Sequence, residues 1–148
     1  MEYLNEFIKS LIPIKFEVEV GALTAFLGTV SSFLFGQYDA LMQAILVVML
    51  MDYITGVLAA TIMPNVKLDS HKGWVGLKKK VAILFIIALA HLFDYAAGQG
   101  DMVRNVVIWF YLGNEGLSIL ENAANCGVPV PNKIKDKLAQ FANDKASR

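Results

Sequence analysis

Cysteine and histidine are scarce in this chain. Among its 148 residues are one cysteine, Cys126, and two histidines, His71 and His91. A single cysteine excludes an internal disulfide and a cysteine-based metal cluster. Neither histidine has a second ligand at the spacing that metal sites use. We therefore expect neither a metal ion nor any other cofactor.

The motifs of common enzymes are also absent. No serine lies in a strand–turn–helix elbow, and no glycine-rich loop could cradle a phosphate. Asp52 is followed by the sequence YITG, and not by the flexible, glycine-flanked loop of an intramembrane aspartyl protease. No long basic tract with interleaved aromatic residues indicates a nucleic-acid groove. The chain is therefore expected to be neither an enzyme nor a nucleic-acid-binding protein.

Apolar residues, by contrast, are abundant. They make up 56% of the chain, and its mean hydropathy is +0.52. A soluble domain of this size cannot bury so much apolar surface, so lipid or self-association must cover it. Four stretches approach the roughly 20 apolar residues that cross a bilayer core. They are residues 20–36, 41–61, 81–98 and 102–120. The sequence predicts an all-α integral membrane protein with four transmembrane helices, or three if the short first stretch does not cross.

The charges are distributed unevenly although the formal net charge is zero. The connection of residues 62–80 is rich in lysine, as are the termini, whereas the two opposite turns carry aspartates and a single arginine. The lysines of the connection are Lys67, Lys72, Lys78, Lys79 and Lys80. Cytoplasmic loops of membrane proteins carry an excess of lysine and arginine. We therefore expect a cytoplasmic-membrane protein with both termini in the cytoplasm.

The chain is expected to form a single domain of three parts. Residues 1–19 are an amphipathic segment, with Tyr3, Phe7, Ile8, Leu11 and Ile12 at helical spacing. Such a helix can lie on the membrane surface. Residues 20–120 hold the transmembrane helices. Residues 121–148 form a basic cytoplasmic tail, either a surface helix drawn to anionic lipid or a solvated segment.

Small residues follow one face of the first apolar stretch. Gly21, Ala25, Gly28 and Ser32 recur at the helical spacing i, i+4, i+7 and i+11. A small face lets helix backbones approach closely in lipid. The alternative is that glycine, alanine and serine are simply common in membrane helices. We interpret the four residues as a candidate helix-packing face.

Ionisable residues fall at similar depth in three of the predicted helices: Asp52, His91 and Glu115. Charged groups at membrane depth are costly and usually face a bundle interior or water. No cation lies near Asp52 or Glu115 in the sequence, which favours a wet interior or pairing between subunits. The residues predicted to line this pore or assembly face are Asp52, Thr55, Gly56, His91, Tyr111, Asn114 and Glu115.

Two further charges flank the predicted outer turn between the last two spans. Asp94 precedes this turn and Arg104 follows it. Opposite charges on neighbouring helices can hold the helices together. We expect Asp94 and Arg104 to form an interhelical pair.

Several short stretches of the chain match a known family in order. They are residues 51–60 (MDYITGVLAA), 76–80 (GLKKK), 114–123 (NEGLSILENA) and 127–131 (GVPVP). On these residues the chain resembles the toxin-secretion/phage-lysis holins, found in phages of Gram-positive bacteria and beside some clostridial toxin genes. The first forty residues add little to the match. Members are often described with three spans, so the first apolar stretch is the one that the resemblance leaves in question.

The resemblance implies a small protein of the bacterial cytoplasmic membrane that oligomerises into lesions. An endolysin, which is a cytoplasmic cell-wall hydrolase, or a large toxin would leave the cell through them, and the host cell would lyse. The partners are then the lipid bilayer and further copies of the chain, and direct contact with the cargo is not implied. The competing interpretation is a small ion or proton channel or transporter, with Asp52, His91 and Glu115 as a relay.

Overall fold

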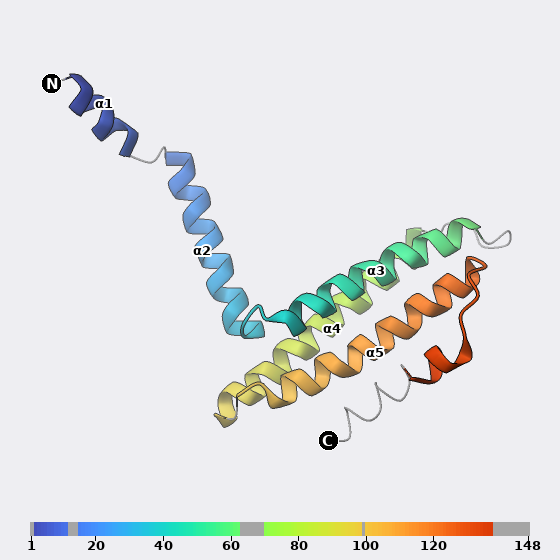
Figure 1. Ribbon diagram of the computed structural model, residues 1–148. Coiled ribbons are helices and arrows are strands. Elements are labelled where there is room, and N and C mark those ends of the chain that lie inside the picture. Colours follow the sequence, from blue (N-terminus) through green and yellow to red (C-terminus); the bar gives the residue numbers. More distant parts are fainter. Residues whose placement is uncertain (1, 12–14, 63–69, 99, 138–148) are drawn as a thin grey trace. The chain divides into compact units, whose positions relative to one another are not determined.

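The structure is a computed structural model that describes residues 2–11, 15–62, 70–98 and 100–137 (Figure 1). The apolar residues Ile12, Leu138 and Phe141, Lys67, and the end of the basic tail lie outside the described residues. Within them all regular structure is helical, which confirms the all-α prediction. The principal helices are α1 (Glu2–Leu11), α2 (Lys15–Phe35), α3 (Ala40–Ile62), α4 (Ser70–Ala97) and α5 (Met102–Asn125).

Three of the described helices are long and apolar enough to cross a membrane, judged by length and composition. They are Lys15–Phe35, Ala40–Ile62 and Gly73–Ala97. The first apolar stretch is therefore among them, and the predicted span of residues 102–120 is not. Its helix, α5, is 24 residues long but carries Arg104, Asn114 and Glu115. These polar residues lower its hydropathy without shortening the helix.

Residues Met1–Phe33 form one compact unit and Leu34–Arg148 another. Helix α2 carries Lys15, Glu17 and Glu19 at its start, has no charged residue from Val20 onward, and has no buried residue. The hydroxyls of Thr24 and Thr29 donate to the carbonyls of Val20 and Ala25, both at 2.8 Å. Because these two hydroxyls are satisfied within the helix, neither threonine brings an unpaired donor into lipid.

The second unit is built on α3, α4 and α5. Helix α5 packs against both of the others, whereas α3 and α4 contact each other much less. The core consists of side chains at helical spacing: Met42, Ile45, Met49, Ile83, Ile87 and Ile108. Ile45, Ile87 and Ile108 are fully buried. Each isoleucine comes from a different helix, so the core joins the first third of α3 and of α5 to the second half of α4.

The opposite faces of α3 and α4 are apolar and exposed. Leu50 and Ile54 on α3 are 59% and 55% exposed, and Phe85 on α4 is 71% exposed. A helix that is apolar on its outer face as well as its inner face is typical of a membrane span. These faces therefore suit contact with lipid, and the helix interfaces are where polar side chains can be sheltered.

Candidate functional site

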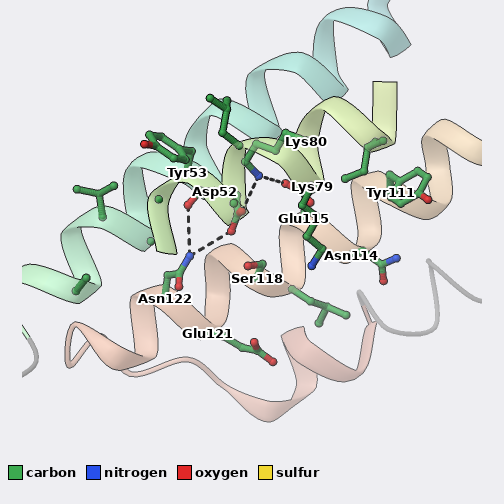
Figure 2. A pocket seen from close by; sticks show the side chains of 18 of the residues that line it. Asp52, Tyr53, Lys79, Lys80, Tyr111, Asn114, Glu115, Ser118, Glu121 and Asn122 are labelled. Atoms are coloured by element: carbon green, nitrogen blue, oxygen red, sulfur yellow. Dashed lines mark hydrogen bonds and ion pairs between the residues drawn. The ribbon is translucent and has the colours of Figure 1, made fainter. Parts of the chain in front are cut away.

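A cavity of about 930 Å³ lies between α3, α4 and α5, next to the end of α3 and the start of α4 (Figure 2). It is bordered by apolar residues and by a group of polar ones. The polar residues that matter below are Asp52, Lys79, Lys80, Asn114, Glu115, Ser118, Glu121 and Asn122. A cavity of this size has room for several water molecules, and its polar residues offer them hydrogen-bond partners.

Three charged side chains meet at the cavity wall, one from each helix (Figure 2). Lys80 Nζ lies 2.7 Å from Asp52 Oδ2 and 2.5 Å from Glu115 Oε2. The side chains of Lys80, Asp52 and Glu115 are only 12%, 16% and 6% exposed. Sheltered charges are tolerated when they are paired and hydrogen-bonded. We call this cluster the Lys80 triad; with two carboxylates and one ammonium its formal charge is −1.

Asn122 on α5 extends the triad. Its Nδ2 donates to Asp52 Oδ1 and to Thr55 Oγ1, both at 3.2 Å. The Thr55 hydroxyl in turn donates to the carbonyl of Asp52 at 3.1 Å. The second carboxylate oxygen of Asp52 is therefore satisfied as well as the one that faces Lys80. This network joins the middle of α3, which holds Asp52 and Thr55, to the last turn of α5.

No cation lies near Asp52 or Glu115 in the sequence, and the structure supplies Lys80. Lys80 is 28 and 35 residues away from the two carboxylates, so closeness along the chain could not reveal the pairs. A signal was nevertheless present in the helical register. Lys80, Ile83 and Ile87 follow i, i+3 and i+7, so Lys80 shares the buried face of α4. Lys78 and Lys79 do not share this face and are exposed.

The predicted pore or assembly residues divide into two groups. Six of them gather at the cavity: Gly56, Tyr111, Asn114 and the two carboxylates line it, and Thr55 bonds to Asn122. His91 does not join them. Its Nδ1 lies 3.4 Å from Asp101 Oδ1, near the other end of α4. We expected Asp52, His91 and Glu115 to lie in one layer of the membrane. The structure instead places Asp52 and Glu115 at the cavity and His91 near the other end of α4.

Arg104 forms a second polar cluster at that other end. Its side chain is fully buried, and its Nε donates to the carbonyl of Phe35 at 2.7 Å. Nη2 donates to the carbonyl of Gln37 and Nη1 to Asp39 Oδ2, both at 2.9 Å. The hydrogen bond from Arg104 holds the pKa of the Asp39 carboxyl below its ordinary value of 3.8. Arg104 therefore fastens the turn before α3 to the start of α5.

The structure places Asp94 against the backbone of Arg104 and not against its guanidinium. Asp94 is 2% exposed and accepts hydrogen bonds from the amides of Val103 and Arg104 at 3.0 and 2.8 Å. These amides belong to the first turn of α5, where N–H groups have no partner within the helix. The expected interhelical pair is thus replaced by two contacts. Asp94 caps α5, and Asp39 takes the charge of Arg104.

These features define a helical membrane protein whose charged side chains are held between its helices. The model of the bacteriophage holin family matches residues 29–143, which is most of the chain. The chain belongs to the bacteriophage holin family. The resemblance seen in the sequence is thereby confirmed, as is placement as a multi-pass protein of the cytoplasmic membrane. Because this family forms membrane pores and is not enzymatic, the expectation that the chain is no enzyme is also confirmed.

Relatives in Gram-positive bacteria and in a phage are similar over most of their length. An uncharacterized protein of Listeria innocua is 40% identical over 114 residues, which are 77% of this chain and 80% of that protein. An uncharacterized 14.9 kDa protein of Clostridium perfringens is 39% identical, over 80% of this chain and 89% of its own. A probable holin of Bacillus phage phi105 is 32% identical, over 76% of this chain and 82% of its own length. No solved structure matches the chain.

Proposed function

We propose that this chain is a holin that oligomerises in the cytoplasmic membrane and forms lesions through which an endolysin leaves the cytoplasm. Lysis of the host cell follows from that release. The observation that carries the proposal is the Lys80 triad beside a cavity, within a bundle whose outer faces suit lipid. A protein that only had to stay in the membrane would have no need of charges there. Membership of the holin family supports the same function.

The arrangement of the core favours lesions made by several subunits over a channel through one. Ile45, Ile87 and Ile108 are fully buried where the three helices pack together. On each helix the isoleucine lies between the Lys80 triad and the Arg104 cluster. A single protomer is therefore sealed by an apolar plug, and a water-filled path needs polar faces that several copies contribute. We place Asp52 and Glu115 on those faces.

A topology with four crossings and both termini in the cytoplasm fits the packing of α5. Helix α5 is tied to the turn before α3 by Arg104 and to the middle of α3 by Asn122. If α3 and α4 cross the bilayer, α5 crosses with them, since its polar residues find partners inside the bundle. The lysine-rich connection then marks the cytoplasmic side. The whole chain is thus one holin domain, with residues 1–19 and 121–148 as its amphipathic and basic ends.

Helix α2 is the element that we assign to contacts between copies. Its small face, Gly21, Ala25, Gly28 and Ser32, is exposed along the helix. A side chain added at Gly21 or Gly28 would meet no other atom within 4 Å. Small faces of this kind allow close helix packing in membranes. Subunits in the lesion would pack through this face, while the cargo, endolysin or toxin, need not touch the protein.

The competing function is a small ion or proton channel, which the sheltered charges of the Lys80 triad favour. The experiment that separates the two expresses the chain in bacteria together with a reporter cell-wall hydrolase that lacks a signal peptide. A holin releases the folded hydrolase, and the culture lyses. A channel abolishes the membrane potential, followed with a voltage-sensitive dye, and leaves the hydrolase in the cytoplasm. Depolarisation without release would reject the holin proposal.

A further inference from the structure

We infer that Lys80 is the positioning residue that keeps Asp52 and Glu115 inside the separate protomer. The step that frees the two carboxylates is then the breaking of its two ion pairs. This inference deepens the proposed holin function and rests on it for its consequence, the timing of lesions. It concerns the state before assembly, in which the polar face has to be hidden.

The geometry of Lys80 suits this role because one ammonium serves two helices. Nζ contacts Asp52 on α3 and Glu115 on α5, and Lys80 itself lies on α4. Helices α3 and α4 make few contacts with each other, so the cavity separates them where Lys80 lies. Lys80 therefore bridges a gap that apolar packing leaves open. Loss of this bridge removes the two ion pairs that tie α4 to α3 and α5 at the cavity.

The formal charge of the triad makes Lys80 more important than either carboxylate. With Lys80 in place the triad carries −1; without it two sheltered carboxylates face each other with no cation between them. Like charges in a sheltered site repel strongly, and removing one partner of such a cluster leaves uncompensated charge. The two carboxylates are then driven toward water, which the adjoining cavity can supply. Opening of the protomer at the triad relieves both the repulsion between the carboxylates and the cost of sheltering their uncompensated charge.

The chain offers a matched control at the neighbouring position. Lys79 also lines the cavity, but it is exposed and belongs to neither ion pair. Lys79→Gln and Lys80→Gln thus make the same change of side chain and charge at the same cavity. Only Lys80→Gln breaks the contacts to Asp52 and Glu115. Lys80→Arg keeps a cation in place and serves as the conservative rescue.

A cysteine placed in the cavity wall reports opening directly. Gly56 lines the cavity, and a Cβ added there would lie 3.5 Å from Asn122 Nδ2, an ordinary contact distance. We would alkylate Gly56→Cys with iodoacetamide, in a Cys126→Ser background and in membranes opened so that the reagent reaches both faces. Iodoacetamide is neutral, so the local charge does not attract or repel it. Removing a nearby cation also disfavours the reactive thiolate. Electrostatics alone would thus slow the reaction, and acceleration reports opening.

We expect Lys80→Gln to speed alkylation about tenfold or more over Lys79→Gln, because a sheltered ion pair shifts an equilibrium far more than an exposed charge does. Lys80→Arg should stay close to the wild type. The double variant Lys80→Gln, Asp52→Asn keeps the formal charge at −1 without an ion pair, and it is measured in case Lys80→Gln does not accumulate. The inference would be overturned if Lys80→Gln, or the double variant where Lys80→Gln does not accumulate, is alkylated no faster than Lys79→Gln.

Release of the reporter hydrolase is followed in the same strains, at matched amounts of membrane protein. Lys80→Gln should release the hydrolase earlier than Lys79→Gln does. Failure of the wild type to release any hydrolase would reject the proposed function, while faster alkylation of Lys80→Gln would still support the positioning role. Normal release by the wild type with unchanged alkylation would reject the positioning role alone.

Discussion

Replacing Arg104 by glutamine should damage this protein more than the loss of any exposed cation. The guanidinium is fully buried and donates to the carbonyls of Phe35 and Gln37 and to the carboxylate of Asp39. Glutamine is shorter and carries no charge, so it cannot reach all three acceptors. Arg104→Gln therefore leaves at least one of these buried acceptors without its donor and removes the cation that pairs with Asp39.

The size of the effect follows from these contacts. Hydrogen bonds that involve a charged group contribute about 1.5–3 kcal/mol each, and breaking a buried ion pair by removing one partner costs about 3–5 kcal/mol. The Asp39 side chain is 36% exposed, so water compensates part of its loss. We expect Arg104→Gln to lower the free energy of unfolding by about 3 kcal/mol, a large share of the 5–15 kcal/mol typical of a domain.

The measurement is unfolding of purified protein in detergent micelles, followed by helical circular dichroism, with Lys137→Gln as control. Lys137 is exposed, and its loss should change stability by less than about 0.5 kcal/mol. The charge swap Asp94→Arg with Arg104→Asp should not restore stability, because the guanidinium pairs with Asp39 and Asp94 caps α5. Equal stability of Arg104→Gln and Lys137→Gln, or rescue by the swap, would refute the assignment of these partners.

Three further predictions concern other parts of the molecule. Asp39→Asn should destabilise the protein at neutral pH. Since the folded pKa of Asp39 lies below its ordinary 3.8, the difference in stability between the variant and the wild type should persist down to about pH 4 and shrink as the pH falls further. A difference that does not depend on pH would contradict the pairing. Asp52→Asn should insert normally, judged by blot, but shift the time of hydrolase release, whereas Asp52→Leu should block release; normal timing with both would remove Asp52 from the mechanism. In a Cys126→Ser background, a membrane-impermeant maleimide outside intact cells should label Tyr38→Cys but not Lys137→Cys, and the reverse pattern would invert the topology.

Hydropathy located α3 to within one residue at each end and the end of α4 equally well, but not the start of α4. The predicted stretch 81–98 ends one residue beyond α4, which begins at Ser70. Eleven residues were assigned to the connection because they hold four lysines and two glycines. Hydropathy detects only the part of a helix that lies in hydrocarbon. A helix that continues into the headgroup region keeps its backbone hydrogen bonds and takes polar side chains there.

The carboxylates of the candidate site could be predicted from the sequence, but the pairing of its cations could not. Asp52 and Glu115 stand out because they interrupt apolar stretches. Lys80 belongs to a run of three lysines that indicates a membrane boundary, and its pairing depends on which face of α4 packs inward. Arg104 was noticed, but its partners Phe35 and Gln37 act through backbone carbonyls, which no side-chain pattern encodes. Contacts between distant backbone and side-chain atoms emerge only from the packing of the helices.

The two polar clusters differ in a way that bears on how a protomer opens. Arg104 is fully buried and is held by the carbonyls of Phe35 and Gln37 and by the Asp39 carboxylate, before α3. Lys80 is held only by side chains, and it borders a cavity from which water could replace either carboxylate. Water competes for a hydrogen bond only where it can reach the atoms. We therefore expect opening to begin at the Lys80 end while the Arg104 end stays closed. Hydrogen exchange should accordingly be faster for amides of α4 near Lys80 than for those near Asp94, and the opposite order would show that the protomer opens from the Arg104 cluster.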